Sequence, residues 1–187
     1  ARGGASLAGL RGPGGLNLHD ARAAEFLNGL SSGGFHRIHY TDWGDPSSER
    51  VVICVHGLSR NCRDFDFLAA AIADDFRVVC PDIAGRGRSD WLANKDDYAY
   101  PQYMADLNAL IARLTEPAMP GGILGKLSAL LHKNHRSKKI YWVGTSMGGA
   151  ICLTAAREGW LPFSRLVVLA PMVAICMIRR PKPARSG

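Results

Sequence analysis

Three short apolar runs in the middle of this sequence constrain its fold more than any other feature. Residues 51–57 are VVICVHG, residues 76–83 are FRVVCPDI, and residues 139–146 are KIYWVGTS. Each run is mainly apolar and ends at glycine, proline or a polar turn residue, which is typical of strands buried on both faces. Such strands are parallel, and parallel neighbours need crossover connections that are usually helical.

Helix-forming segments occupy the intervals between these runs. Residues 63–75 and 100–114 have apolar residues at helical spacing, and residues 148–159 form a third such segment that ends at glycine. Residues 165–172 predict a further strand, and the alternating residues 35–45 predict an early strand or hairpin. This alternation predicts an α/β protein with a doubly wound, mostly parallel sheet and helices on both of its faces.

Length and composition place these elements in one domain. With 187 residues, 47% of them apolar, the chain can bury one substantial core. We expect a poorly ordered N-terminal segment over residues 1–34, a core over residues 35–173 and a basic tail over residues 174–187. The first nineteen residues are rich in Gly, Ala and Leu and contain no acid, so we expect a frayed or truncated start there in preference to a targeting segment.

The apolar runs and the cysteines bear on the cellular compartment. The longest apolar run, residues 166–178, has 13 residues and contains a proline, which is too short for a membrane span. The 5 cysteines are widely spaced and form no C-x-x-C pair, which argues against a disulfide or zinc framework. We therefore expect a soluble, cytoplasmic protein with packed thiols and no metal site.

The net charge of +7 is a property of the second half of the chain alone. Residues 126–187 carry 11 Lys or Arg and one acid, whereas residues 1–125 carry 12 basic and 15 acidic residues. The clusters at residues 133–139 and 179–187 predict a solvated loop and a disordered tail, with weak contact to an anionic membrane surface as the alternative. We expect no nucleic-acid partner, and the glycine-rich residues 84–90 lack the G-K-[ST] of a phosphate-binding loop.

The stretch VGTSMGGA, residues 143–150, places Ser146 at a predicted turn from strand to helix. A serine at such a turn is lifted clear of the sheet, and Gly144, Gly148 and Gly149 leave room for a strained backbone and close helix packing. The first N–H groups of the following helix direct partial positive charge at any negative oxygen that forms beside the serine. The pattern therefore predicts a nucleophilic serine.

With this motif and two others, the chain resembles the α/β-hydrolase superfamily over roughly residues 35–173. The matching stretches are VHGLSRN, PDIAGRGRSD and VGTSMGGA, in the superfamily's order. The resemblance implies that Ser146 is the nucleophile, that the N–H groups of Leu58 and Met147 form the oxyanion hole, and that His56 and Gly57 organise the oxyanion loop. It also implies hydrolysis of small carboxylic esters or of acylglycerols and lysophospholipids, with no cofactor.

The rest of a catalytic triad is harder to find. In this superfamily the acid and the histidine follow the serine, but all 6 histidines precede Ser146 and the only later acid is Glu158. We expect a chain that is incomplete after its sixth strand and nearly inactive alone; the alternative is that His132 or His135 folds over the site. The resemblance also shifts near residue 117, from general bacterial hydrolases to the lysophospholipase and monoacylglycerol-lipase branch, which predicts a joined or frame-altered sequence.

Two other interpretations stay open. The chain is either a serine hydrolase or a non-catalytic fragment that keeps the scaffold and binds acyl ligands or a partner; thioester or C–C bond hydrolysis would use the same nucleophile. Residues 117–139 contain a predicted amphipathic helix, for which packing on the sheet is the expected role and lipid contact the alternative.

Overall fold

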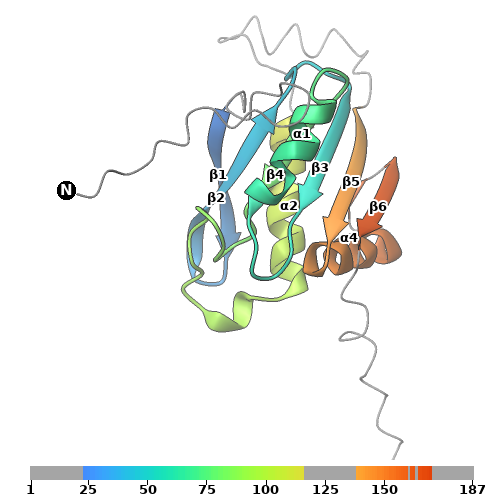
Figure 1. The fold of residues 1–187 in the computed structure, drawn as a ribbon. Helices are drawn as coiled ribbons and strands as arrows, with labels where there is room; N and C mark the ends of the chain where they lie inside the picture. Colours follow the sequence, from blue (N-terminus) through green and yellow to red (C-terminus); the bar gives the residue numbers. More distant parts are fainter. Residues whose placement is uncertain (1–22, 116–137, 160, 163, 170–187) are drawn as a thin grey trace, which may run out of the picture.

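A computed structural model describes residues 23–115, 138–159, 161–162 and 164–169 of the chain. In this part, six strands form one sheet in the order β1-β2-β4-β3-β5-β6 (Figure 1). Their bounds are Ala23–Ser31 for β1, Gly34–Trp43 for β2, Arg50–Val55 for β3, Arg77–Pro81 for β4, Lys139–Thr145 for β5 and Arg165–Leu169 for β6.

Helices lie between the strands, as the crossover argument requires. Their bounds are Asp66–Ile72 for α1, Tyr100–Thr115 for α2 and Met147–Glu158 for α4, with 3-10 turns η1 at Cys62–Phe65 and η2 at Lys95–Asp97. Strands β4, β3, β5 and β6 run parallel, whereas β1 and β2 pair antiparallel at one edge of the sheet. The prediction of a mostly parallel sheet is confirmed.

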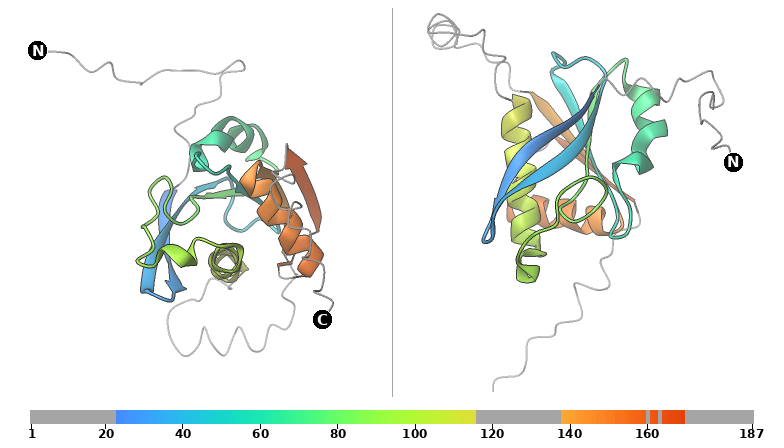
Figure 2. Two further views of the ribbon diagram at one scale, coloured as in Figure 1. Left: turned by 90° about the horizontal axis from the view of Figure 1, so that it is seen from below. Right: turned by 90° about the vertical axis from the view of Figure 1, so that its left-hand side faces the viewer.

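The apolar run of β3 serves two cores, because successive side chains of a strand point to opposite faces. Val51, Ile53 and Val55 pack in the core that α2 and α4 cover, whereas Val52 and Cys54 pack in the core that α1 covers. Figure 2 shows α1 on one face of the sheet and α2 and α4 on the other. The predicted doubly wound α/β fold is therefore correct.

The prediction that residues 1–34 are poorly ordered is wrong for their last part. Strand β1 lies inside that range and pairs with β2 along its whole length, from Ala23 opposite Asp42 to Ser31 opposite Gly34. Gly34 has a φ of 110°, which lets the two strands meet in a tight turn. A strand at a sheet edge needs an apolar residue only on its inner face, so its sequence lacks the continuous apolar run that marks the central strands.

The cysteines of the described part behave as packed thiols. Cys54, Cys62, Cys80 and Cys152 are all buried and free. Burial raises the pKa of the Cys62 and Cys152 thiols to about 12, so neither forms the reactive thiolate at neutral pH. The expectation of packed thiols is confirmed for these four residues, and Cys176 lies outside the described part.

Several predicted segments cannot be placed. His132, His135 and the amphipathic stretch that begins at residue 117 lie outside the described residues, as does the basic tail over residues 174–187. Among the helices of the described part, none combines the length and the apolarity that crossing a membrane requires.

Candidate active site

Ser146 stands alone between β5 and α4 in an unusual backbone conformation. Its φ is 51° and its ψ is −116°, and among the described residues no other non-glycine residue has a positive φ. Its N–H donates to the carbonyl of Leu169 at 3.1 Å, and its carbonyl accepts from the N–H of Ala150 at 3.1 Å. Such a conformation costs about 1–3 kcal/mol and persists only where the surroundings enforce it, which is characteristic of functional sites.

The glycines around Ser146 allow backbones to touch. A Cβ atom at Gly144 would lie 2.7 Å from the carbonyl oxygen of Gly148 and 2.8 Å from the Cα atom of Gly149. A Cβ atom at Gly148 would overlap the carbonyl of Val55 and lie 2.7 Å from the carbonyl oxygen of His56. The first turn of α4 therefore packs directly on the backbone at the end of β3.

This packing brings the loop after β3 beside the serine. A Cβ atom at Gly57 would lie 3.3 Å from the Cβ atom of Ser146 and 3.7 Å from its Oγ atom. The lack of a side chain at Gly57 therefore leaves space beside the hydroxyl. Ser146 itself is half-buried, and the next residue, Met147, is buried in the core.

His56 orients this loop and is not available as a base. Its side chain is completely buried; Nε2 accepts from the N–H of Ile83 at 3.0 Å, so Nδ1 carries the proton and donates to the carbonyl of Gly57 at 2.7 Å. Burial lowers the pKa of His56 and keeps the ring neutral. Both ring nitrogens are occupied by the backbone.

The bond from His56 bears directly on the predicted oxyanion hole. The carbonyl of Gly57 and the N–H of Leu58 belong to one planar trans peptide group, so they point in opposite directions. Holding that carbonyl, which also accepts from the N–H of Arg60 at 3.2 Å, fixes the direction of the Leu58 N–H. Within the described residues, the N–H groups of Leu58 and Met147 have no acceptor. That these two groups converge on one oxyanion stays a prediction.

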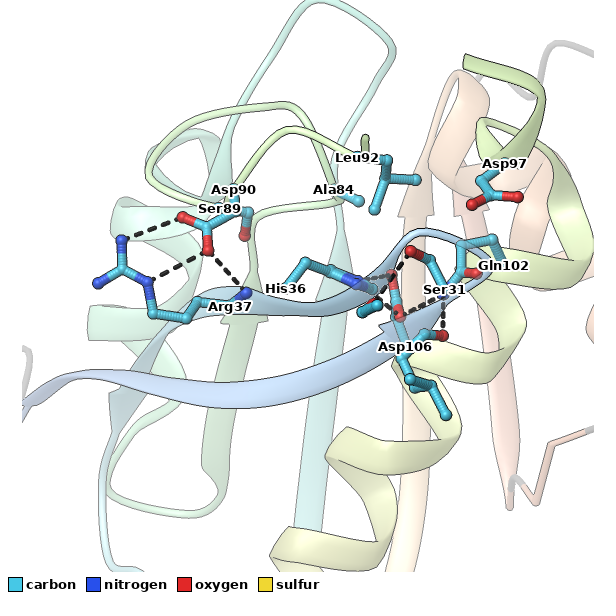
Figure 3. Close-up of polar contacts among 12 residues, drawn as sticks. Ser31, His36, Arg37, Ala84, Ser89, Asp90, Leu92, Asp97, Gln102 and Asp106 are labelled. Carbon is cyan, nitrogen blue, oxygen red and sulfur yellow. Dashed lines mark hydrogen bonds and ion pairs between the residues drawn. The ribbon is translucent and has the colours of Figure 1, made fainter. Parts of the chain in front are cut away.

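No histidine of the described part lies at hydrogen-bond distance from the Ser146 hydroxyl, because the buried histidines have other partners. Nε2 of His36 lies 3.1 Å from both carboxylate oxygens of Asp106, and the amide of Gln102 donates to the same carboxylate at 2.8 Å. Figure 3 shows that this group joins β2 to α2. The structure therefore does not bring a base to the serine from residues it describes.

His39, Cys62 and Asp82 form a compact buried cluster whose ligand atoms all lie within 4.8 Å of one another. Their residue types suit a transition metal, but hydrogen bonds already account for the carboxylate: Asp82 accepts from the N–H of Cys62 at 2.7 Å, from the N–H of Arg88 at 2.9 Å and from Nδ1 of His39 at 2.8 Å. Burial alone would raise the pKa of Asp82, but these bonds outweigh it and lower the pKa. We interpret the cluster as the anchor of the loop after β4.

Comparison with known proteins agrees with this geometry. A model of the alpha/beta hydrolase family matches residues 52–186. The chain belongs to the alpha/beta hydrolase family. It is 41% identical over 157 residues to a 3-hydroxybutyrate-oligomer hydrolase of Cupriavidus necator, a match that covers 83% of this chain and 46% of that protein.

Two solved structures are also similar. An alpha/beta hydrolase from Novosphingobium aromaticivorans has 33% identity and a TM-score of 0.55, over 78% of this chain and 43% of that chain. A hydrolase structure from Rickettsia typhi has 26% identity and a TM-score of 0.56, over 78% of this chain and 46% of that chain. The chain spans about half the length of the relatives it matches.

These matches also bear on the predicted join near residue 117. The family match runs from residue 52 to residue 186, and a match of 157 residues in a chain of 187 must cross residue 117 as well. One family therefore accounts for both sides of that position, so the shift in resemblance does not indicate a join between unrelated sequences. The family match also includes residues 174–186, which we set apart as a basic tail.

We predict that Gly148→Ala destabilises this alpha/beta hydrolase by about 3 kcal/mol, because the new methyl group overlaps the carbonyl of Val55 and forces backbones apart. Urea unfolding followed by circular dichroism measures the loss. Gly159→Ala is the matched control, since its φ of 67° is positive but nothing lies within 4 Å of the added carbon, and it should lose only about 1 kcal/mol. Equal losses in the two variants would contradict the proposed steric overlap.

A second prediction concerns pH. In Asp82→Asn, whichever way the amide is turned, its NH2 group faces a backbone N–H, so stability at pH 7 should fall by about 2 kcal/mol. Because the pKa of Asp82 is lowered in the folded state, the carboxylate stabilises the fold above its unfolded pKa of roughly 3.9, and this is lost as pH falls further. Urea unfolding between pH 7 and pH 3 should show the gap between wild type and variant closing below about pH 4. A difference in stability that does not change with pH would refute the stabilising role of the ionised Asp82 carboxylate.

Proposed function

We propose that this chain carries the nucleophile and the oxyanion loop of a carboxylic ester hydrolase that works through an acyl-enzyme on Ser146. The observation that carries the proposal is the strained backbone of Ser146, held in contact with Gly57 at the point where β5 meets α4. Strain at a serine, where glycine would be relaxed, indicates that the hydroxyl is needed there.

The reaction follows from this arrangement. Ser146 Oγ attacks the acyl carbon while a base takes its proton, and the carbonyl oxygen becomes an oxyanion. The N–H groups of Leu58 and Met147, with the N-terminal end of α4 behind the latter, stabilise that negative charge. The ester C–O bond then breaks, the alcohol leaves with the proton, and water releases the acid from Ser146 by the same steps in reverse order.

The base is proposed to lie outside the described residues. Two sources are His132 or His135 of this chain, and the half of the relatives' length that this chain does not span. Without a base, stabilisation of the oxyanion and substrate binding still give a rate about 10³ to 10⁴ above that in water. We therefore propose that this chain alone turns over esters slowly.

The substrate class follows in part from the relative in Cupriavidus necator, whose name states that it acts on 3-hydroxybutyrate oligomers. The units of such an oligomer are joined by ester bonds, which the mechanism above cleaves. We propose short oligoesters of a hydroxy acid as the first substrates to test, with acylglycerols and lysophospholipids second.

A fluorophosphonate probe tests the nucleophile directly, because it phosphonylates only a serine whose surroundings activate it. The full chain should be labelled slowly, since the proposed base lies outside the described residues, and Ser146→Ala should abolish labelling, as read by intact-protein mass spectrometry. Ser59→Ala is the control, since Ser59 is an exposed serine of the same loop region. Absence of labelling on well-folded protein would instead support a non-catalytic module that binds acyl ligands, which is the alternative favoured by the lack of a described base.

The oxyanion hole has its own test. Leu58→Pro removes the N–H group at residue 58 and should slow labelling by roughly a hundredfold, since loss of one such donor typically has this effect. Leu58→Ala keeps the N–H group and should label at nearly the wild-type rate. Circular dichroism checks that both variants are folded, and equal rates for the two would refute the role of this amide.

A further inference from the structure

A groove of about 530 Å³ lies beside the candidate oxyanion hole. It runs between the loop after β3 and the loop after β4, and the side chains that matter for its chemistry are Leu58, Arg60, Arg86, Trp91 and Tyr98. Leu58, whose N–H is the predicted oxyanion donor, is half exposed and forms part of the wall. A substrate whose carbonyl carbon lies at Ser146 therefore has this groove as its neighbour.

We propose that Arg86 binds a carboxylate of the substrate in this groove, so that the enzyme prefers esters carrying a free acid group close to the scissile bond. The inference rests on the proposed function and narrows its substrate class. Its ligand is a short ester with a carboxylate, such as the acid end of a hydroxy-acid oligomer or a dicarboxylic half-ester.

The guanidinium of Arg86 is held in place by neutral groups. Nε donates to the carbonyl of Leu58 at 3.1 Å, and Nη1 donates to the carbonyl of Ala84 at 2.8 Å and to the hydroxyl of Tyr103 at 3.2 Å. The cation also lies over the rings of Tyr98 and Tyr103, at 5.8 Å and 5.6 Å from their centroids. Within the described residues, Nη2 has no hydrogen-bond partner, so a fixed donor remains for a ligand.

The charge of Arg86 has no carboxylate to balance it in the described part of the chain. Six of the nine other arginines there pair with acids: Arg37 with Asp90, Arg50 with Asp75, Arg60 with Asp64, Arg63 with Asp66, Arg77 with Asp42 and Arg157 with Glu158. Arg60, the second cation of the groove, is thus neutralised, since its Nε atom lies 2.9 Å from both oxygens of Asp64. Arg86 alone presents an unbalanced charge to the groove.

The chemistry of the walls suits a small organic acid. A guanidinium binds a carboxylate through charge-assisted hydrogen bonds, which are about twice as strong as neutral ones. Trp91, which is 80% exposed, and Leu58 offer apolar surface for the few carbons between the acid and the ester. The oligomer hydrolase of Cupriavidus necator is named for a substrate that ends in such an acid, which agrees with the inference.

The same contacts give Arg86 a positioning role, because its bond to the Leu58 carbonyl helps to hold the oxyanion loop. Loss of Arg86 would therefore weaken the binding of every substrate to some degree. Only the preference for an acid over its neutral ester separates carboxylate binding from this structural effect, so that preference is the quantity to measure.

The experiment uses the full chain with Ser146→Ala, so that bound esters are not consumed. Isothermal titration calorimetry compares the linear dimer of 3-hydroxybutyrate as the free acid with its methyl ester. We expect the acid to bind about tenfold more tightly, as expected for one charge-assisted hydrogen-bonded pair, and salt to reduce the difference. Adding Arg86→Met should abolish the preference, Arg86→Lys should keep part of it, and Arg60→Met should leave it nearly unchanged.

Equal binding of acid and ester to the Ser146→Ala chain, or a preference that survives Arg86→Met, would overturn the proposal. A failure of the free acid to bind would also overturn it. If Arg86→Met does not fold, the comparison of Arg86→Lys with Arg60→Met decides, because unchanged preference in both would likewise overturn it. The proposed function fails separately, since fluorophosphonate labelling of Ser146 uses a neutral probe that does not need Arg86 to bind an acid.

Discussion

The contact between the start of α4 and the end of β3 positions the whole candidate site. At Gly148 a helix backbone lies directly on the carbonyls of Val55 and His56, with no side chain between them. Side chains can change rotamer to absorb small errors, but two backbones in contact cannot, so the relative placement of the two elements is rigid. The hydroxyl of Ser146 and the loop that begins at Gly57 are therefore held together by the fold itself.

The loop after β3 is in turn held by the loop after β4. Three hydrogen bonds cross between them: His56 accepts from the N–H of Ile83, Asp82 accepts from the N–H of Cys62, and Arg86 donates to the carbonyl of Leu58. The neutral ring of His56, the carboxylate of Asp82 and the guanidinium of Arg86 thus each join the two loops. The glycine-rich sequence after β4 therefore supports the loop after β3, although its composition is close to that of a phosphate-binding loop.

The sequence predicted the central sheet because β3 and β4 are buried on both faces, and β5 is buried on one face and mostly half-buried on the other, so all three need mainly apolar residues. It also predicted the turn at Ser146, since glycines at 144, 148 and 149, between a strand and a helix, indicate backbones in close contact. It missed β1, whose stability comes from pairing with β2 and leaves only a weak pattern in its own residues. It could not reveal the charge balance of Arg86 either, because whether a cation has a partner depends on contacts between residues far apart in the chain.

At residue 146, the residue that would be most stable in the observed backbone conformation differs from the residue that the proposed chemistry needs. Glycine adopts a φ of 51° without penalty, whereas any residue with a side chain is strained there. Selection of variants for heat resistance alone would therefore enrich glycine at this position and remove the hydroxyl in the same step. A homologue in which glycine replaces this serine would be recognisable as a lineage that kept the scaffold without the proposed nucleophile.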